Sequence, residues 1–205
     1  EKNDRVGGLL RYGIPDFKMD KGHIDRRMAQ LQAEGVTVRT GVLVGEWPQD
    51  SKVTNWAKET VSAAQLQKDF DAVLHAGGSE QSRDLPVPGR ELDGIHPAMD
   101  YLYQRNRAVA TMAGNEAPTA DHPISAAGKR VVVIGGGDTG MDCISNALRE
   151  GAVDVKLLDV YGELPESGRD ASTPWPMSPK RTRTTYALDE GGERRWGTEV
   201  TGFEG

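Results

Sequence analysis

The chain has 205 residues, of which 37% are hydrophobic, and it carries a formal net charge of −6 at pH 7. This length allows one complete domain or parts of two, and the acidic charge argues against non-specific binding to nucleic acid. The single cysteine, Cys143, excludes a disulfide framework and a cysteine-ligated metal site within this sequence, and the histidines lack metal-ligand spacing. No apolar run reaches the roughly 20 residues of a membrane span and no signal peptide is recognisable. We therefore expect a cytoplasmic protein that contacts neither nucleic acid nor membrane.

Residues 1–110 show alternating helical and strand patterns. Ile24, Met28 and Leu31 recur with helical spacing behind Asp20, which is a good N-cap residue. Ser62 and Gln65 have the spacing of a capping box. The elements expected in chain order are a helix over 20–34, a strand region over 36–44, irregular chain over 45–61, a helix over 62–70, a short buried strand over 71–76 and a helix over 98–107.

Residues 111–128 are rich in small residues and contain Pro118 and Pro123, which is typical of a linker. Before this stretch, the last strand pattern ends at Gly77 and Gly78, and after it a new strand pattern begins. We therefore predict one domain over 1–110, a linker over 111–128 and a second domain over 129–205.

An apolar, β-branched run over 131–134 stops at a glycine-rich sequence with the spacing G-x-G-x-x-G. This pattern predicts a strand, a tight turn and a helix whose N-terminus holds the pyrophosphate of a dinucleotide. Gly135 would form the turn, Gly137 would let the backbone approach the pyrophosphate, and Gly140 would let the helix pack close to the strand. The alternative is a glycine-rich turn that binds nothing. The residues predicted to line the site are Gly135, Gly136, Gly137, Asp138 and Thr139.

The following residues complete the pattern of a Rossmann-like unit. A helix is predicted over 141–149, with Gly151 as its stop, and then a strand over 153–158. Asp159 stands roughly 20 residues after the glycines, where an acidic residue contacts the hydroxyl groups of the adenosine ribose. No arginine follows it closely, which favours NADH over NADPH but leaves both coenzymes open. Beyond it we expect a surface excursion over 161–195 and a strand over 200–203.

Three segments resemble the small (β) subunits of glutamate synthases. They run from Gly7 to Lys18, from Arg83 to Leu92 and from Gly135 to Cys143. The Trp175-Pro176 pair and the region around Gly191 are similar to an insertion in those subunits, so the resemblance extends over nearly the whole chain. Related reductase modules, such as that of dihydropyrimidine dehydrogenase, share the first and third segments and are less similar over 165–195.

The resemblance implies an α/β flavoprotein of the two-dinucleotide-binding-domain type. A Rossmann-like NAD(P)-binding domain would be inserted into an FAD-binding domain that is incomplete in this sequence. Because the first glycine turn of such a flavin domain would precede Glu1, we expect this sequence to be a piece of a longer protein and to bind FAD poorly by itself. The residues implied to contact FAD are Glu1, Gly8, Leu9, Lys18, Val44, Gly77 and Gly78.

The activity implied by the resemblance is electron input. Hydride would pass from NAD(P)H to FAD, and electrons would pass through 4Fe-4S clusters to the large (α) subunit, where glutamine and 2-oxoglutarate yield glutamate. The cluster ligands are absent from this sequence. Because the two cofactors carry the redox chemistry themselves, we predict no catalytic acid, base or nucleophile.

Two alternatives to this function stay open. One is the reductase arm of another NAD(P)H-dependent flavoprotein, and the other is a dinucleotide-binding fragment without catalysis. A free-standing disulfide reductase is disfavoured, since its chemistry needs a dithiol and the sequence has one cysteine.

Overall fold

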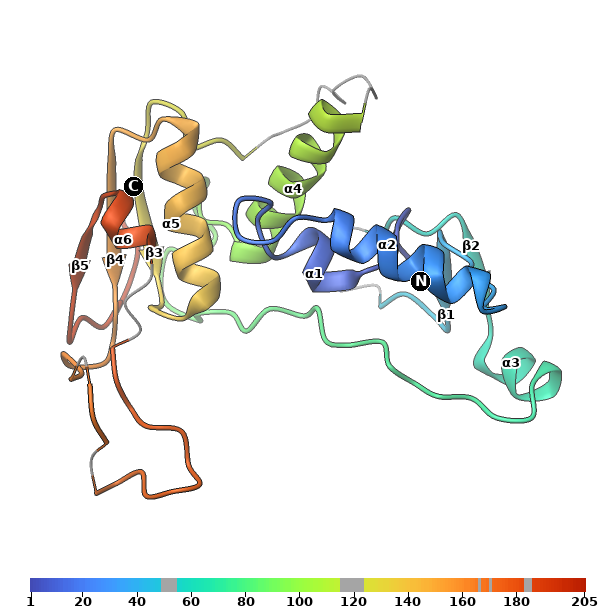
Figure 1. Cartoon of the computed structure of the whole chain (residues 1–205). Helices are drawn as coiled ribbons and strands as arrows, with labels where there is room; N and C mark the ends of the chain where they lie inside the picture. Colours follow the sequence, from blue (N-terminus) through green and yellow to red (C-terminus); the bar gives the residue numbers. More distant parts are fainter. Residues whose placement is uncertain (49–54, 115–123, 166, 170, 183–185) are drawn as a thin grey trace. The chain divides into compact units, whose positions relative to one another are not determined.

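The structure is a computed structural model of the chain, and it describes residues 1–48, 55–114, 124–165, 167–169, 171–182 and 186–205. By its internal contacts the chain divides into two compact units, Glu1–Asp84 and Leu85–Gly205 (Figure 1). Each unit is described by itself below.

The first unit contains three short helices and a parallel pair of strands among its described residues. Strand β1 pairs with β2 so that Val42 stands opposite Glu59 and Val44 opposite Val61. The backbone near the start of the chain also contacts this pair, since Val42 N–H donates to the Glu1 carbonyl at 3.0 Å. The elements are α1 (Gly8–Tyr12), α2 (Gly22–Ala33), β1 (Val42–Val44), β2 (Glu59–Val61) and α3 (Ala63–Asp69).

Helices α2 and α3 confirm what the sequence predicted for them. Ile24 is the buried residue of α2, and its helical neighbours Met28 and Leu31 are partly buried. Asp20 accepts a hydrogen bond from Gly22 N–H at 2.7 Å, so it stabilises the start of the helix although the helix begins two residues later than expected. At the start of α3, Ser62 Oγ accepts a hydrogen bond from the Gln65 amide at 3.1 Å.

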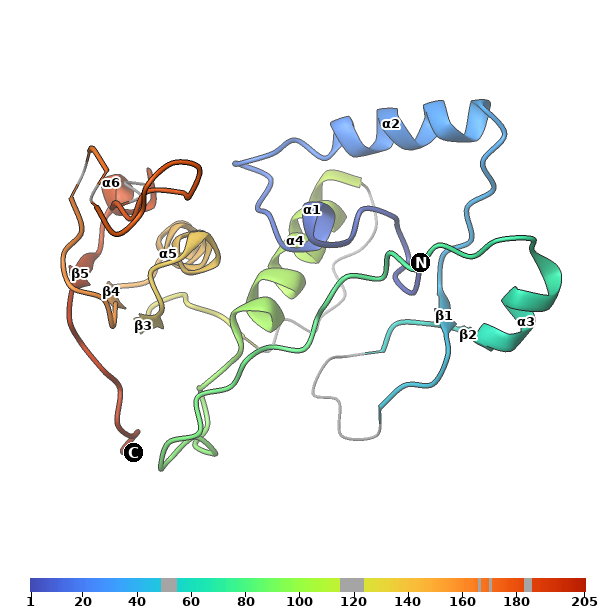
Figure 2. The same ribbon diagram turned by 90° about the horizontal axis from the view of Figure 1, so that it is seen from below.

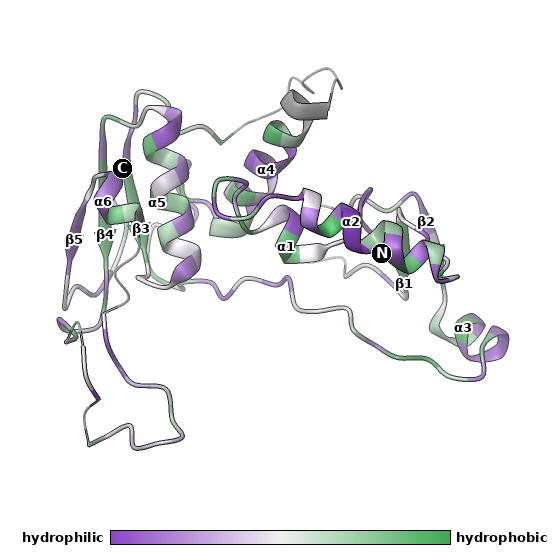
Figure 3. Cartoon of the chain, in the orientation of Figure 1, coloured by the Kyte–Doolittle hydropathy of each residue, from purple (hydrophilic) through white to green (hydrophobic). Residues whose placement is uncertain are grey.

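The strand predictions for the first unit are partly wrong. The strand expected over 36–44 is reduced to Val42–Val44, and the segment 45–61, expected to be irregular, contributes β2. The expected buried strand over 71–76 is absent from the structure: Val73 is 53% exposed and Leu74 is 92% exposed. A strand needs a neighbour to take up its N–H and C=O groups, and no described residue of this unit pairs with 71–76. Figure 3 shows the hydrophobic colour of this uncovered stretch just after α3.

The second unit is built around a parallel sheet with the order β3-β4-β5 in its described part. Arg130 stands opposite Asp154 and Ile134 opposite Leu158, while Leu157 stands opposite Arg194. Helices α5 and α6 lie on the same face of this sheet (Figure 2). The elements are α4 (Ala98–Gly114), β3 (Arg130–Ile134), α5 (Asp138–Glu150), β4 (Asp154–Leu158), α6 (Tyr186–Glu190) and β5 (Glu193–Arg195).

The core of the second unit lies between the sheet and α5. Alternate residues of β4, Val155 and Leu157, are buried because a strand points successive side chains to opposite faces. The opposite face of β3 is open, and Val132 is 57% exposed. Figure 3 shows that β3 and β4 are largely hydrophobic and β5 is hydrophilic. The buried core residues are Ala126, Met141, Ile144, Ala147, Val155, Leu157 and Ala187.

A second contact of α5 is with α4. Tyr101 and Leu102 from α4 pack with Cys143 from α5. Glu150 ties the two helices together, since it accepts a hydrogen bond from the Tyr101 hydroxyl at 2.8 Å and forms an ion pair with Arg105 at 3.3 Å. Burial, followed by the bond to Glu150, raises the pKa of Tyr101 above its ordinary value.

Helix α4 is longer than the helix predicted over 98–107, and it extends into the linker predicted over 111–128. Its contact with α5 explains why the division between the compact units falls after Asp84 rather than within 111–128. Residues 115–123 of that linker lie outside the described residues. The assignment of 1–110 to an FAD domain and of 129–205 to an NAD(P)H domain stays a prediction.

The expected surface excursion over 161–195 is wrong in its last part, which returns to the fold as α6 and β5. Glu190 anchors α6 to α5 by accepting two hydrogen bonds from Arg149, both at 2.9 Å. These bonds hold the pKa of the Glu190 carboxyl below its ordinary value. The strand expected over 200–203 is absent, and Phe203 N–H instead donates a single hydrogen bond to the Pro88 carbonyl at 2.8 Å.

Candidate coenzyme site

The glycine-rich turn joins β3 to α5 as the sequence predicted. Gly135 has a φ of 106°, a conformation that side chains other than glycine rarely adopt, and its N–H donates to the Leu158 carbonyl at 2.9 Å. Gly137 is the N-cap of α5 and makes no side-chain capping hydrogen bond. The N–H groups of the first helical turn are therefore not taken by a capping side chain, which suits a pyrophosphate at the positive end of the helix.

Gly140 brings α5 against the backbone of the turn. A Cβ atom at this position would overlap the Gly135 carbonyl oxygen and lie 3.4 Å from the Val133 side chain. Only a residue without a side chain fits there, so the role predicted for Gly140 in close packing is confirmed. Gly137 differs, because a Cβ atom added to it would meet no atom within 4 Å. The open space beside Gly137 suits the approach of a ligand.

Asp159 lies immediately after β4, at the carboxyl edge of the sheet, and is 4% exposed. Its Oδ1 accepts a hydrogen bond from the Tyr161 amide at 3.1 Å. Its Oδ2 pairs with Arg194 Nη2 at 2.5 Å. A Cβ atom on Gly136 would overlap both Asp159 Oδ2 and the Arg194 guanidinium. The acidic residue and the glycine-rich turn are thus adjacent, as the sequence predicted.

Arg194 is the residue that the sequence analysis missed. No arginine was expected near Asp159, because none stands among the residues that directly follow it and 161–195 were predicted to be a surface excursion. In the structure β5 pairs in parallel with β4 and places Arg194 opposite Leu157, on the face that carries the buried core. The sequence offers no hydrophobic signal for this strand, because Glu193, Arg194 and Arg195 are all charged; the partial burial of Arg194 between two exposed residues is visible only in the structure.

The structure brings the predicted coenzyme residues to one end of the sheet. Five of these residues lie in the glycine-rich loop after β3 and in the first turn of helix α5, and the acidic residue follows the end of β4. Their contacts with a ligand stay predictions. They are Gly135, Gly136, Gly137, Asp138, Thr139 and Asp159.

The residues predicted to contact FAD lie in the first unit and stay predictions. Leu9 on α1 and Val44 at the end of β1 are 53% and 51% exposed. Glu1 Oε1 accepts a hydrogen bond from the Asn3 amide at 2.8 Å. The others occupy exposed or partly exposed positions outside the two strands, namely Gly8, Lys18, Gly77 and Gly78.

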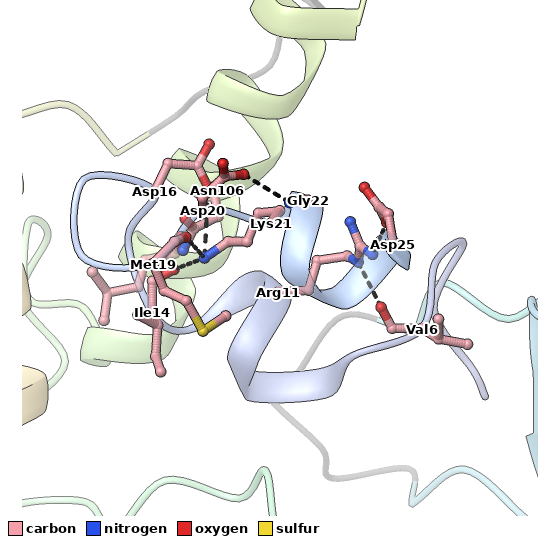
Figure 4. A network of polar contacts seen from close by, with 11 residues as sticks. Val6, Arg11, Ile14, Asp16, Met19, Asp20, Lys21, Gly22, Asp25 and Asn106 are labelled. Atoms are coloured by element: carbon pink, nitrogen blue, oxygen red, sulfur yellow. Dashed lines mark hydrogen bonds and ion pairs between the residues drawn. The ribbon is translucent and has the colours of Figure 1, made fainter. Parts of the chain in front are cut away.

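Polar contacts hold the backbone around the predicted flavin segment (Figure 4). Arg11 donates from Nε to the Val6 carbonyl at 2.5 Å and pairs with Asp25 of α2. Lys21 donates to the carbonyls of Ile14, at 2.5 Å, and of Met19, at 3.3 Å. These bonds satisfy main-chain acceptors in a stretch with little regular structure, so they shape the segment between α1 and α2.

The described residues of the first unit do not form the second nucleotide-binding corner that FAD would need. Among its described residues, no strand passes through a glycine turn into a helix: β1 ends at Val44 without a following helix, and β2 reaches α3 through Ser62. The described residues alone therefore do not fit FAD.

Among the described residues of both units, no group of three or more His, Cys, Asp or Glu residues is arranged to hold a metal ion. Nor does any described helix have the length and apolar character needed to cross a membrane.

Cys143 is a buried residue of α5, and burial followed by the nearby Asp142 charge raises the pKa of its thiol to about 12. At pH 8 the thiol is protonated and shielded, so we expect iodoacetamide to label it in the folded chain at least about 100-fold more slowly than in urea, because the thiolate is the reactive form. Mass spectrometry of the labelled peptide measures both rates. Labelling at equal rates in the folded and unfolded chain would contradict the packing of α5 against α4.

Comparison with known proteins identifies the family of this chain. The sequence pattern of the pyridine nucleotide-disulphide oxidoreductase family matches residues 19–173. The glutamate synthase [NADPH] small chain of Mycobacterium tuberculosis is 45% identical over the whole of this chain and 39% of its own length. The corresponding small chain of Bacillus subtilis is 38% identical over 93% of this chain and 35% of its own length. The glutamate synthase [NADH] of Schizosaccharomyces pombe is 40% identical over 93% of this chain and 8% of its own length.

The chain thus spans about two fifths, or less, of the length of these relatives. The family match includes all of β3, α5 and β4, and with them the glycine-rich turn and Asp159. Because this match covers more than half of the sequence and includes the strand, glycine-rich turn and helix seen in the structure, the chain belongs to the pyridine nucleotide-disulphide oxidoreductase family.

Proposed function

We propose that this chain is the NAD(P)H-binding part of a glutamate synthase small subunit, the subunit that feeds electrons into the enzyme. The observation that carries the proposal is the corner formed by Gly135, Gly137 and Gly140 between β3 and α5, with Asp159 at the end of the neighbouring strand. The relatives that cover the whole chain carry the name glutamate synthase small chain, which supports this function over a generic reductase.

In this proposal the chain's own residues bind and orient the nicotinamide coenzyme. The turn and the N-terminus of α5 would hold the pyrophosphate, and the groups around Asp159 would hold the adenosine ribose. The family implies a flavin as well as NAD(P)H, and the flavin supplies the chemistry of accepting hydride when it is bound. FAD, the 4Fe-4S clusters and the large (α) subunit belong to the proposed whole protein.

Calorimetric titration of the purified chain with NADH and, separately, with NADPH tests the proposal. We expect saturable binding of one or both coenzymes with a stoichiometry near one. Circular dichroism of the same sample establishes that it is folded. A folded chain that binds neither coenzyme would overturn the proposal, because the glycine corner would then be a turn without a ligand.

A second measurement separates electron input from binding without catalysis. The full-length parent protein, with its flavin, is mixed with NADPH or NADH and an artificial acceptor such as ferricyanide. Oxidation of the coenzyme is expected for the proposed function. Its complete absence in a flavin-loaded preparation would instead favour a dinucleotide-binding protein that does not turn over.

A further inference from the structure

The ion pair between Asp159 and Arg194 lies against one side of the glycine-rich turn. Both side chains are nearly buried, with exposed fractions of 5% for Asp159 and 10% for Arg194. They come from neighbouring parallel strands, since Asp159 follows β4 and Arg194 is the middle residue of β5. The pair touches the backbone of Gly136, where a Cβ atom would overlap both side chains. This location is where the adenosine ribose is expected when a dinucleotide binds such a turn.

The Arg194 guanidinium uses only part of its hydrogen-bonding capacity. Nη2 pairs with Asp159, whereas the buried Nε and Nη1 have no hydrogen-bond partner among the described residues. The planar group also stacks on the Trp196 ring, with its central carbon 3.6 Å from the ring centroid. A buried guanidinium with unsatisfied N–H groups is costly, and phosphate, like carboxylate, has oxygens whose geometry matches such a planar fork.

The ion pair also changes what Asp159 does to a coenzyme. An unpaired carboxylate beside the ribose repels the 2′-phosphate of NADPH and accepts a hydrogen bond from the 2′-hydroxyl of NADH. Here the positive charge of Arg194 lies at 2.5 Å from Asp159 Oδ2 and offsets the negative charge. The ion pair thus offsets the negative charge on which the expected preference for NADH rests.

We propose that Arg194 is the residue that determines coenzyme choice, by binding the 2′-phosphate of the adenosine ribose so that the site takes NADPH. This inference rests on the proposed function and adds to it the identity of the coenzyme and the residue that selects it. On binding, the guanidinium shares its N–H groups between Asp159 and the phosphate, while Trp196 keeps its plane oriented.

Two nucleotides that differ only in the 2′-phosphate, 5′-AMP and adenosine 2′,5′-bisphosphate, test this directly. Calorimetry on the complete chain is expected to show tighter binding of the bisphosphate. Arg194→Met keeps a side chain that can pack on Trp196 but removes the charge, and we expect the bisphosphate affinity to fall about 10-fold or more. The affinity for 5′-AMP is expected to change by less than about threefold.

Arg195→Met is the matched control, because Arg195 is the next residue of the same strand and its side chain is 52% exposed and bound to Glu193. This variant is expected to bind both nucleotides as the unchanged chain does. If Arg194→Met does not fold, Asp159→Asn serves instead: it removes the negative charge and is expected to strengthen binding of the bisphosphate relative to 5′-AMP.

Three results would overturn the inference. The first is an equal loss of affinity for both nucleotides in Arg194→Met. The second is a loss of bisphosphate affinity in the Arg195→Met control as large as in Arg194→Met. The third is tighter binding of 5′-AMP than of the bisphosphate by the unchanged chain, and each of these results would remove Arg194 from phosphate recognition. These outcomes leave the proposed function standing, since a nucleotide still binds. A folded chain that binds neither these nucleotides nor NADH nor NADPH would overturn both the inference and the proposed function.

Discussion

Replacing Gly140 by alanine is expected to destabilise the second unit strongly, whereas replacing Gly137 by alanine is expected to leave its stability almost unchanged and to weaken coenzyme binding. The difference follows from what each new methyl group would meet. At Gly140 it overlaps the Gly135 carbonyl oxygen, which is backbone and has no rotamer by which to move away. At Gly137 it meets nothing within 4 Å, and the φ of −79° and ψ of 177° are accessible to alanine.

The expected sizes differ accordingly. Overpacking against backbone at Gly140 should cost about 2 kcal/mol or more of the free energy of unfolding, which is a large part of the stability of a small unit. The Gly137→Ala methyl stands where the pyrophosphate would approach the helix N-terminus, so NAD(P)H affinity should fall about 10-fold or more with little change in stability.

Hydrogen exchange of the amides in 130–134 and 154–158 measures the stability of the sheet, and calorimetry measures coenzyme affinity. Gly162→Ala is the matched control, since Gly162 is exposed and an added Cβ atom there meets nothing within 4 Å. A folded Gly140→Ala variant with unchanged exchange would contradict the close packing of α5 on the turn. Unchanged coenzyme affinity in Gly137→Ala would remove the helix N-terminus from the binding site.

Leu157→Ala is expected to destabilise the sheet of the second unit by about 3 kcal/mol, within the range measured for leucine truncations in protein cores. Leu157 has no exposed surface and lies on the central strand β4, in the cluster that includes Met141 and Ile144. Its removal leaves a cavity that the surrounding strands cannot fill without breaking their hydrogen bonds to β4.

The matched control is Val132→Ala, on the opposite face of the neighbouring strand, where the valine is 57% exposed. It is expected to change stability by less than about 1 kcal/mol. Hydrogen exchange of the β3 and β4 amides compares the two variants with the unchanged chain. Equal effects of the two substitutions would mean that the helices do not cover the Leu157 face of the sheet.

Local sequence patterns were enough to predict the elements whose stability is decided within a few residues. The β-branched run before Gly135 predicted β3, and the glycine spacing predicted the turn and the packing of α5. Ile24 and its neighbours predicted α2, and Ser62 with Gln65 predicted the start of α3. The likeness to glutamate synthase small subunits was also readable from the sequence, because long motifs such as the run from Gly135 to Cys143 carry it.

Elements that depend on distant partners were predicted poorly. Strand β2 has only three residues and exists because it pairs with β1, and the apolar stretch 71–76 has no described partner and forms no strand. Strand β5 was not predicted because it is short and polar and lies in a stretch with the composition of a surface loop. Its pairing with β4 nevertheless makes it part of the sheet. The sequence shows which residues favour a strand but does not show which neighbour is within reach.

The sequence by itself determined the family, the strand–turn–helix corner at Gly135 and the position of Asp159, because strand, turn and helix signals adjoin one another along the chain. Only the tertiary structure decided that Asp159 is paired with Arg194, which lies 35 residues further on. Two residues that far apart meet because parallel strands need a long connection, here containing α6, before the chain can return to the same edge of the sheet.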